Sequence, residues 1–130
     1  MLIFGHSFIP SESLYHVIDI DSILNTPPSS IIYLEFSEEN LDIIEYLSSN
    51  VVEFALDVKD ITELIYASSL GAKYILLSRE MAKTAQNIAE SYLFDAKILA
   101  HITENEEIEE LALLGVDGVI FSNAIIKINS

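Results

Sequence analysis

Four side chains with metal-binding or acid–base chemistry stand at the ends of short apolar runs in this sequence. They are His6, Glu35, Asp57 and His101. The runs have the character of β-strands, and parallel strands bring their carboxyl ends to one edge of a sheet, where pockets form. Imidazole nitrogens and carboxylate oxygens together bind divalent cations, and a bound metal activates water or polarises a phosphoryl oxygen. These four residues are therefore a candidate divalent metal site.

A purely structural explanation of the same residues is favoured by the sequence. Polar side chains are expected wherever a buried strand emerges into solvent, and Ser or Asp at such a position usually caps the next helix. No other cofactor is predicted. His16 lies in an irregular amino-terminal segment and is assigned no function.

A second group of polar residues at predicted strand ends is suited to binding an anion or another small ligand. It consists of Ser78, Arg79, Ser122 and Asn123. Arg79 is the only arginine, and at a helix amino terminus it could bind an anion together with backbone amides. An ion pair with one of the many carboxylates is the favoured alternative. The four glycines form no phosphate-binding loop, and no Gly-x-Ser-x-Gly elbow is present.

The elements that must position these residues recur at nearly even spacing. Apolar runs occupy residues 31–36, 51–58, 73–77, 97–102 and 118–121, and each gap between them holds one helix-like pattern. A strand and a crossover helix repeated in this way build a parallel sheet. We therefore predict one α/β domain over residues 1–130, with βα repeats in a mainly parallel five-stranded sheet over 31–130. Residues 1–30 are predicted to form an irregular β-hairpin region.

Most of the predicted strands are apolar at both alternate positions, so both faces of the sheet must be covered. A three-layer sandwich with helices on each face is the favoured architecture. The second choice is a half-barrel whose concave face is buried by a second copy of the chain. A closed eight-fold barrel needs roughly 200 residues or more.

Local signals mark the helix ends. The stretches 60–63 (Asp-Ile-Thr-Glu) and 103–106 (Thr-Glu-Asn-Glu) have the form of capping boxes, and Gly71 follows a helix where a left-handed residue often ends it. Ala82, Ala85 and Ala89 give the third predicted helix a face of small residues. That face is predicted either to form a homodimer contact or to cover the chain's own sheet.

Composition limits the partners of the protein. The 21 acidic residues exceed the 6 basic ones and give a net charge of −15, which disfavours nucleic acid and anionic membrane surfaces. There is no cysteine, which excludes disulfides, thiolate catalysis and cysteine-bound metal clusters. No apolar run approaches the 18–20 or so residues of a membrane span, and no signal-peptide pattern is present at the amino terminus. A cytoplasmic location is expected.

Residues 97–124 read KILAHITENEEIEELALLGVDGVIFSNA and contain the phrase Leu-Gly-Val-Asp-Gly at 114–118. This segment, about a quarter of the chain, resembles the terminal β/α unit of glycerophosphodiester phosphodiesterase-like TIM barrels. The stretch Ile-Phe-Gly-His at 3–6 is similar to the first strand of that family, which carries a metal-site histidine. The resemblance implies a TIM-barrel-like α/β fold and a metal-dependent phosphodiesterase chemistry with His6 as a ligand.

Two functions follow as hypotheses. The favoured one is a noncatalytic α/β module that binds a protein partner or a small ligand and is homo-oligomeric. The alternative is a small metal-dependent phosphodiesterase-like hydrolase that uses the four candidate metal ligands. Between the two, the sequence favours a protein that is not an enzyme, because no complete catalytic motif is present.

Overall fold

The computed structural model describes residues 1–128, and in this range it contains eight strands, five α-helices and three short 3-10 helices. The strands are β1 (Leu2–Phe4), β2 (Leu14–His16), β3 (Ile31–Glu35), β4 (Phe54–Asp57), β5 (Tyr74–Leu77), β6 (Lys97–His101), β7 (Gly118–Ile120) and β8 (Ile125–Lys127). The α-helices are α1 (Ile20–Ile23), α2 (Leu41–Ser49), α3 (Ile61–Ser69), α4 (Ala82–Ser91) and α5 (Glu106–Leu113). The 3-10 helices are η1 (Glu38–Asn40), η2 (Arg79–Met81) and η3 (Ser122–Ala124).

All neighbouring strands are parallel, and their order is β1-β7-β6-β5-β4-β3-β2-β8. The predicted α/β class with βα repeats is therefore confirmed, although the sheet has eight strands rather than five. The predicted hairpin over residues 1–30 is wrong. β1 pairs with β7 and β2 pairs with β3 and β8, so the two strands that would have formed the hairpin are not paired with each other and five strands separate them in the strand order.

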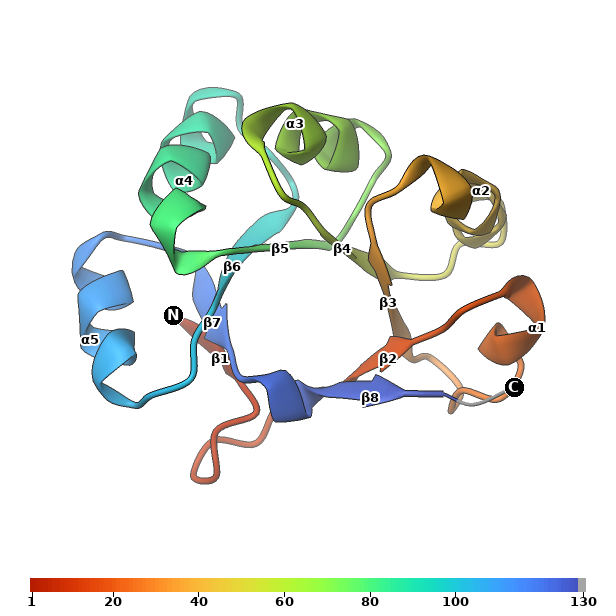
Figure 1. Cartoon of the computed structure of the whole chain (residues 1–130), viewed down its shortest axis with the longest axis horizontal. Coiled ribbons are helices and arrows are strands. Elements are labelled where there is room, and N and C mark those ends of the chain that lie inside the picture. The colour runs from red at the N-terminus through yellow and green to blue at the C-terminus, as the bar shows by residue number, and fades with distance from the viewer. Residues whose placement is uncertain (129–130) are drawn as a thin grey trace.

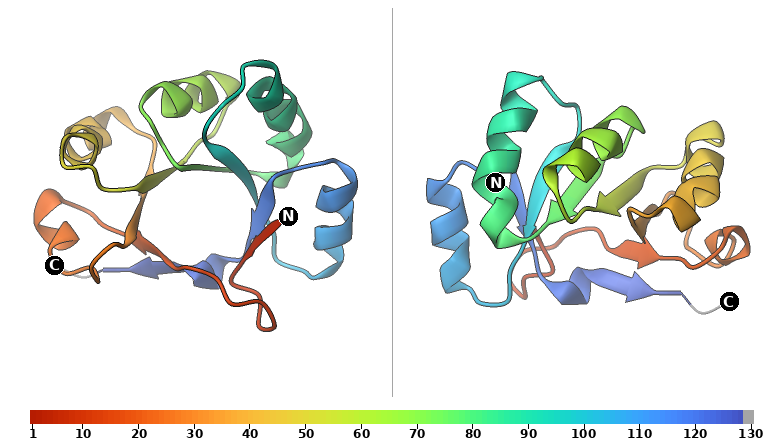
Figure 2. Two further views of the ribbon diagram at one scale, coloured as in Figure 1. Left: turned by 180° about the vertical axis from the view of Figure 1, so that it is seen from behind. Right: turned by 45° about the horizontal axis from the view of Figure 1, so that its top comes forward.

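The sheet curves into a barrel-like ring with the helices on its outer side (Figure 1). Viewed from behind, the helices again lie outside the strands, except along β8 (blue, at the bottom of the left view), which none of the described helices covers (Figure 2). The favoured sandwich is therefore wrong, and the barrel-like alternative describes the architecture. Strands with two apolar faces need both faces covered, but a curved sheet covers its concave face with its own side chains.

Two separate hydrophobic cores result from this curvature. Along β6, Ile98 and Ala100 belong to the outer core beneath the helices, whereas Leu99 belongs to the inner core. The inner core is filled by side chains from β1 to β7 and η3: Phe4, Leu14, Ile31, Tyr33, Ala55, Tyr74, Leu76, Leu99, Ile120 and Ala124. All ten are buried within the single chain, so no second copy is needed to cover the concave face.

The amino-terminal segment, residues 2–16, and the carboxyl-terminal segment, residues 118–127, run side by side and connect the two sides of the curved sheet. β1 pairs with β7, and further along the same two segments β2 pairs with β8. Between these pairings the Phe121 amide donates to the Phe4 carbonyl at 2.9 Å, and the Asn123 side chain donates to the Gly5 carbonyl at 2.9 Å. Neither residues 5–13 nor the β7–β8 connection holds an α-helix, which is how the ring fits into a short chain.

Several local predictions are confirmed. Asp60 caps α3 by accepting from the Glu63 amide at 2.8 Å, and Gly71 ends that helix with φ +92°. The small-residue face of α4 covers the chain's own sheet, since Ala82, Ala85 and Ala89 are buried in the outer core. This is the second of the two explanations predicted for that face, and the homo-oligomer stays a prediction.

Candidate functional site at the carboxyl end of the sheet

Several of the predicted site residues meet at the carboxyl end of the barrel-like sheet. Glu35, Asp57 and His101 are the last residues of β3, β4 and β6, and Ser78 directly follows β5. Each stands two residues after a member of the inner core, so the strand alternation turns its side chain toward the inside of the ring. Strand alternation thus collects these groups at the mouth of the ring, which is the opening at the carboxyl ends of the strands.

Asp57 is the centre of the site. One of its oxygens, Oδ2, accepts a hydrogen bond from the Tyr33 hydroxyl at 2.7 Å and lies 2.7 Å from His101 Nε2. Because an ionised carboxylate only accepts, His101 carries its proton on Nε2 and keeps Nδ1 as an acceptor when the ring is neutral. The His101 side chain is 35% exposed and the Asp57 side chain 20%, so this contact is open to molecules entering the mouth.

Tyr33 was not identified from the sequence, where it stands among apolar strand residues. Its ring lies in the inner core and only its hydroxyl reaches the site. Burial raises the pKa of Tyr33 far above its ordinary value, and the nearby Asp57 and Glu35 carboxylates raise it further. Tyr33 therefore stays protonated and donates to Asp57 at every physiological pH. A tyrosine in an apolar strand was the signal that could have identified this residue, because a buried tyrosine hydroxyl needs a polar partner.

His16 is a second imidazole at the mouth, and it is a residue that is assigned no function from the sequence. Its ring meets the Tyr33 ring edge-on, with 4.9 Å between the ring centres. Burial lowers the pKa of His16; Glu35 opposes this effect, and Lys127 adds to it. The fold therefore favours the neutral form of His16.

Acidification is expected to destabilise the protein through His16. Its pKa in the folded state is below the unfolded value of about 6.5, so the unfolded chain binds more protons as the pH falls below that value. The contribution of neutral His16 to stability is complete above its pKa in the unfolded chain. It is lost as the pH falls through its pKa in the folded protein. In His16→Gln, the drop in melting temperature between about pH 8 and about pH 5 should be smaller than in wild type. An equal drop in both proteins would contradict this assignment.

His6, the candidate ligand on the amino-terminal strand, is held by its own loop. Its Nδ1 accepts from the Phe8 amide at 3.0 Å, and its ring lies 4.8 Å from the Phe8 ring and 5.8 Å from the Phe121 ring. In this tautomer Nε2 carries the proton, so metal binding at Nε2 would require the loop hydrogen bond to break.

Of the four predicted metal ligands, the structure brings Asp57 and His101 into direct contact. Among residues 1–128, no group of three or more His, Asp or Glu side chains is arranged to hold a metal ion. Glu35 is exposed at the end of β3 and lies near enough to influence Tyr33 and His16 electrostatically. The four-ligand metal site stays a prediction.

A cavity of about 330 Å³ adjoins His101. Three residues of the predicted anion- or ligand-binding group line it, namely Ser78, Arg79 and Ser122. The fourth, Asn123, turns instead to the Gly5 carbonyl. The remaining lining residues are Glu80, Ile102, Thr103 and Glu107. Ligand-binding groups from two predictions therefore share one hollow of the surface.

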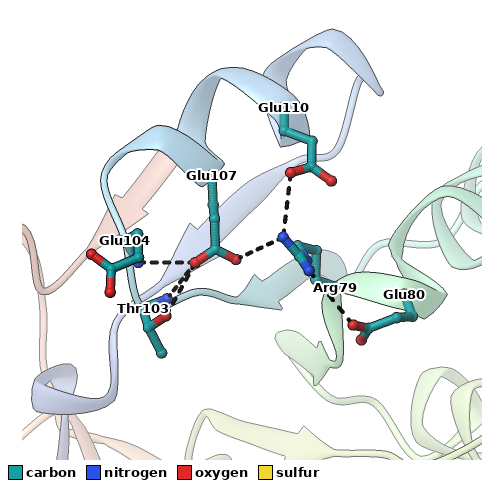
Figure 3. Close-up of polar contacts among 6 residues, drawn as sticks. All are labelled: Arg79, Glu80, Thr103, Glu104, Glu107 and Glu110. Carbon is teal, nitrogen blue, oxygen red and sulfur yellow. Dashed lines mark hydrogen bonds and ion pairs between the residues drawn. The ribbon is translucent and has the colours of Figure 1, made fainter.

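Arg79 is surrounded by carboxylates at the rim of this cavity (Figure 3). Its guanidinium nitrogens lie 3.8 Å from Glu80, 3.3 Å from Glu107 and 3.4 Å from Glu110. The positive charge that an anion would need is thus already matched by three negative ones. The geometry agrees with the ion-pair alternative that the charge balance of the sequence favoured.

Glu107 has a second role at the amino end of α5. Its Oε1 accepts from the Thr103 and Glu104 amides at 3.1 and 2.9 Å, and from the Thr103 hydroxyl at 3.1 Å (Figure 3). These bonds, that from Glu104 above all, lower the pKa of the Glu107 carboxyl. The capping box predicted at 103–106 is therefore wrong by one residue, because Glu107 rather than Glu106 turns back to the preceding amides.

Removal of the Glu107 carboxylate is expected to lower the melting temperature more than removal of the Arg79 guanidinium. Glu107→Ala leaves two amides of the turn before α5 without their acceptor, whereas Arg79→Ala removes ion pairs of an exposed side chain. Glu109→Ala, on an exposed position of the same helix, is the matched control. Thermal unfolding of the three variants followed by circular dichroism tests this order, and a larger effect of Arg79→Ala would refute it.

A larger hollow of the surface is at the other edge of the sheet. It measures about 730 Å³ and is lined by residues 23–24, 26–30 and 51–53, which precede β3 and β4. Glu53 is its one ionisable lining residue. The cavity beside His101 is smaller, but it combines an imidazole, hydroxyl groups and the contact with Asp57, and we treat it as the candidate site.

No protein-family model matches this chain, and no curated protein matches its sequence. The resemblance of residues 97–124 to a barrel family accordingly stays a prediction. Within residues 1–128, none of the helices has the length and apolar character required to cross a membrane.

Proposed function

We propose that this protein binds a small polar molecule at the carboxyl end of its barrel-like sheet. The observation that carries the proposal is the hydrogen-bonded chain Tyr33–Asp57–His101 beside the 330 Å³ cavity. An imidazole held by a carboxylate, which is itself held by a buried tyrosine, is a preorganised polar group of the kind that orients ligands. This proposal follows the small-ligand branch of the function that the sequence favours.

The charges around the mouth indicate which molecules would bind there. Asp57 and Glu35 stand at the ends of their strands, and Arg79 is already paired with three carboxylates. An anionic ligand would therefore meet net negative charge. The hydroxyl groups of Ser78 and Ser122 offer hydrogen bonds without charge. The ligand class that fits is a neutral or cationic molecule with hydroxyl, amine or carbonyl groups.

Nuclear magnetic resonance of isotope-labelled protein tests the proposal. We would add glycerol, ethanolamine, acetamide, acetate and inorganic phosphate separately and record amide and imidazole signals. The neutral or cationic compounds should shift the signals of His101 and of residues 78–79, and His101→Gln should weaken that response. Glu53→Gln, at the opposite edge of the sheet, is the control and should respond like wild type.

Two results would contradict the proposed ligand class. One is a response confined to the two anions, which would mean that the Arg79 cluster opens to receive negative charge. The other is a set of shifts around the larger hollow near residues 51–53, with none at the mouth.

A metal-dependent hydrolase is the second candidate, because two of its four predicted ligands, Asp57 and His101, are in contact at 2.7 Å. A metal bound there would supply Lewis acidity and an activated water. Native mass spectrometry after addition of Zn²⁺, Mn²⁺ or Mg²⁺ should then show one bound ion that is lost in His101→Ala. Full metal retention in that variant would exclude this site. The same spectra measure the subunit number and so test the predicted homo-oligomer.

A further inference from the structure

Ser78 and His101 occupy neighbouring positions on adjacent strands. β5 and β6 are parallel, with Leu77 in register with Ala100, so Ser78, the first residue after β5, follows beside His101, the last residue of β6. Neighbouring strands of a sheet lie about 4.8 Å apart, so residues at neighbouring positions on the same face stand close together. Both residues line the 330 Å³ cavity, and Ser78 is exposed to it. A serine hydroxyl and an imidazole therefore line the same open hollow.

The Ser78 hydroxyl does not cap the helix that follows it, whereas the side chains at comparable positions do. Ser78 precedes η2 in an extended conformation but makes no side-chain capping hydrogen bond. At the equivalent positions before α1, η1 and α3, the side chains of Asp19, Ser37 and Asp60 each accept a backbone amide. Stabilising the following turn therefore does not explain the serine at position 78.

His101 has one ring nitrogen free of the bond to Asp57. Its Nε2 is bound to Asp57, which leaves Nδ1 as the group that can accept a proton. Asp57 stabilises the imidazolium that forms, and Tyr33 fixes the Asp57 carboxylate from the inner core. A nucleophile, a base and a carboxylate that orients the base are the three parts of a serine hydrolase site, and they are recognised by geometry rather than by sequence order.

We infer that Ser78 is a nucleophile activated by His101, and that the protein cleaves small uncharged carboxylic esters. The inference rests on the proposed function, since the ester would be the ligand of the mouth. Asp57 and Tyr33 are positioning residues in this scheme. The paired state of Arg79 argues against anionic substrates.

The reaction is complete with water as the only co-reactant. Ser78 Oγ bonds to the ester carbonyl carbon while its proton passes to His101 Nδ1. The carbon–oxygen bond to the alcohol then breaks, and His101 returns the proton to the departing oxygen. Water next attacks the acyl-serine and gives one proton to His101; the carboxylic acid leaves, and the proton returns to Ser78 Oγ.

Diisopropyl fluorophosphate is a direct probe of such a serine. Ser78 Oγ would bond to phosphorus, fluoride would leave, and His101 would take the hydroxyl proton. Mass spectrometry of peptides should locate a single adduct on Ser78. The labelling rate should fall at least about a hundredfold in His101→Gln, because a positioned base contributes that much or more. Ser78→Ala should give no adduct, while Ser49→Ala, at an exposed serine in the last turn of α2, should be labelled like wild type.

Turnover of p-nitrophenyl acetate tests the positioning role of Asp57. Asp57→Asn should lower kcat at least about tenfold and leave KM unchanged, since the carboxylate acts on the base and not on the ester. Melting temperatures of all variants, measured beside wild type, show whether each is folded.

Three results would overturn the inference: no adduct, an adduct on another residue, or labelling of Ser78 that His101→Gln leaves unchanged in a folded protein. These results are independent of the binding experiment. A neutral ligand that binds at the mouth of a protein without a reactive Ser78 would support the binding function and reject the hydrolase.

Discussion

Replacement of Gly118 by alanine is expected to lower the free energy of unfolding by about 2–3 kcal/mol. A Cβ atom at this position would lie 2.7 Å from three atoms, namely Leu2 Cβ, the Leu2 carbonyl oxygen and Leu99 Cδ2. β7 is held between β1 and β6 at this point, because Gly118 is in register with both Leu2 and Leu99. The added methyl group can be accommodated only if one of these strands shifts.

The carbonyl of Leu2 makes this clash costly. It belongs to the backbone of β1, so it can move away only by disturbing the pairing that joins the amino-terminal segment to the rest of the sheet. A flexible side chain would yield at little cost, whereas a paired backbone does not. The Gly118→Ala protein should therefore lose stability through the β1–β7 pairing, and the amides of residues 2–4 should exchange with solvent faster than in wild type.

Gly71→Ala is the matched control for this substitution. Gly71 has φ +92°, but apart from its chain neighbours nothing lies within 4 Å of an added Cβ, so alanine there is strained without being crowded. Its expected cost is about 1 kcal/mol. Urea unfolding of both variants gives the comparison. If Gly118→Ala were no more destabilising than Gly71→Ala, the contact of β7 with β1 would be looser than the structure describes.

The sequence was sufficient to predict the βα repeats between residues 31 and 121, because each unit carries its own local signals. β3 to β6 are four- or five-residue apolar strands, and Asp60 and Gly71 mark the ends of a helix by their own side chain and backbone conformation. β1 and β2 are only three residues long. Strands that short have no measurable periodicity, and their partners β7 and β8 lie more than a hundred residues away in the sequence.

The choice between a sandwich and a barrel could not be made from hydrophobicity. Ile98 and Leu99 are both fully buried, but one faces the helices and the other the inside of the ring. Both architectures bury both residues, so both produce the same sequence pattern. What decides between them is the pairing of the chain ends, which no local signal reports.

The positions of two candidate-site residues could be predicted as well as the strands that carry them. Asp57 and His101 were placed at one edge because each ends a strand of the repeat, and the structure brings them into contact. His6 was expected to join them, but its loop holds it against Phe8. Tyr33 was missed because a tyrosine in an apolar strand looks like a core residue, and its hydroxyl partner comes from a different strand.

Truncation of Leu76 to alanine is expected to cost about 3–4 kcal/mol of unfolding free energy. The side chain is fully buried in the inner core, where it is in register with Asp57 on β4 and with Leu99 on β6. The cavity left by the substitution would therefore open directly beside the carboxylate that holds His101. Chemical denaturation measures the loss, and Leu113→Ala, at a leucine that is 83% exposed, should cost less than about 0.5 kcal/mol.

This substitution also tests whether the inner core holds the site in place. A rigid layer of side chains beneath Asp57 would keep the carboxylate at 2.7 Å from His101, whereas a cavity there allows the carboxylate to move. The imidazole signals of His101 should therefore shift or broaden in folded Leu76→Ala and remain unchanged in Leu113→Ala. Unchanged signals in Leu76→Ala, together with the expected loss of stability, would mean that Tyr33 alone fixes Asp57. In that case Tyr33→Phe, which removes only the hydroxyl, should produce the shift that Leu76→Ala does not.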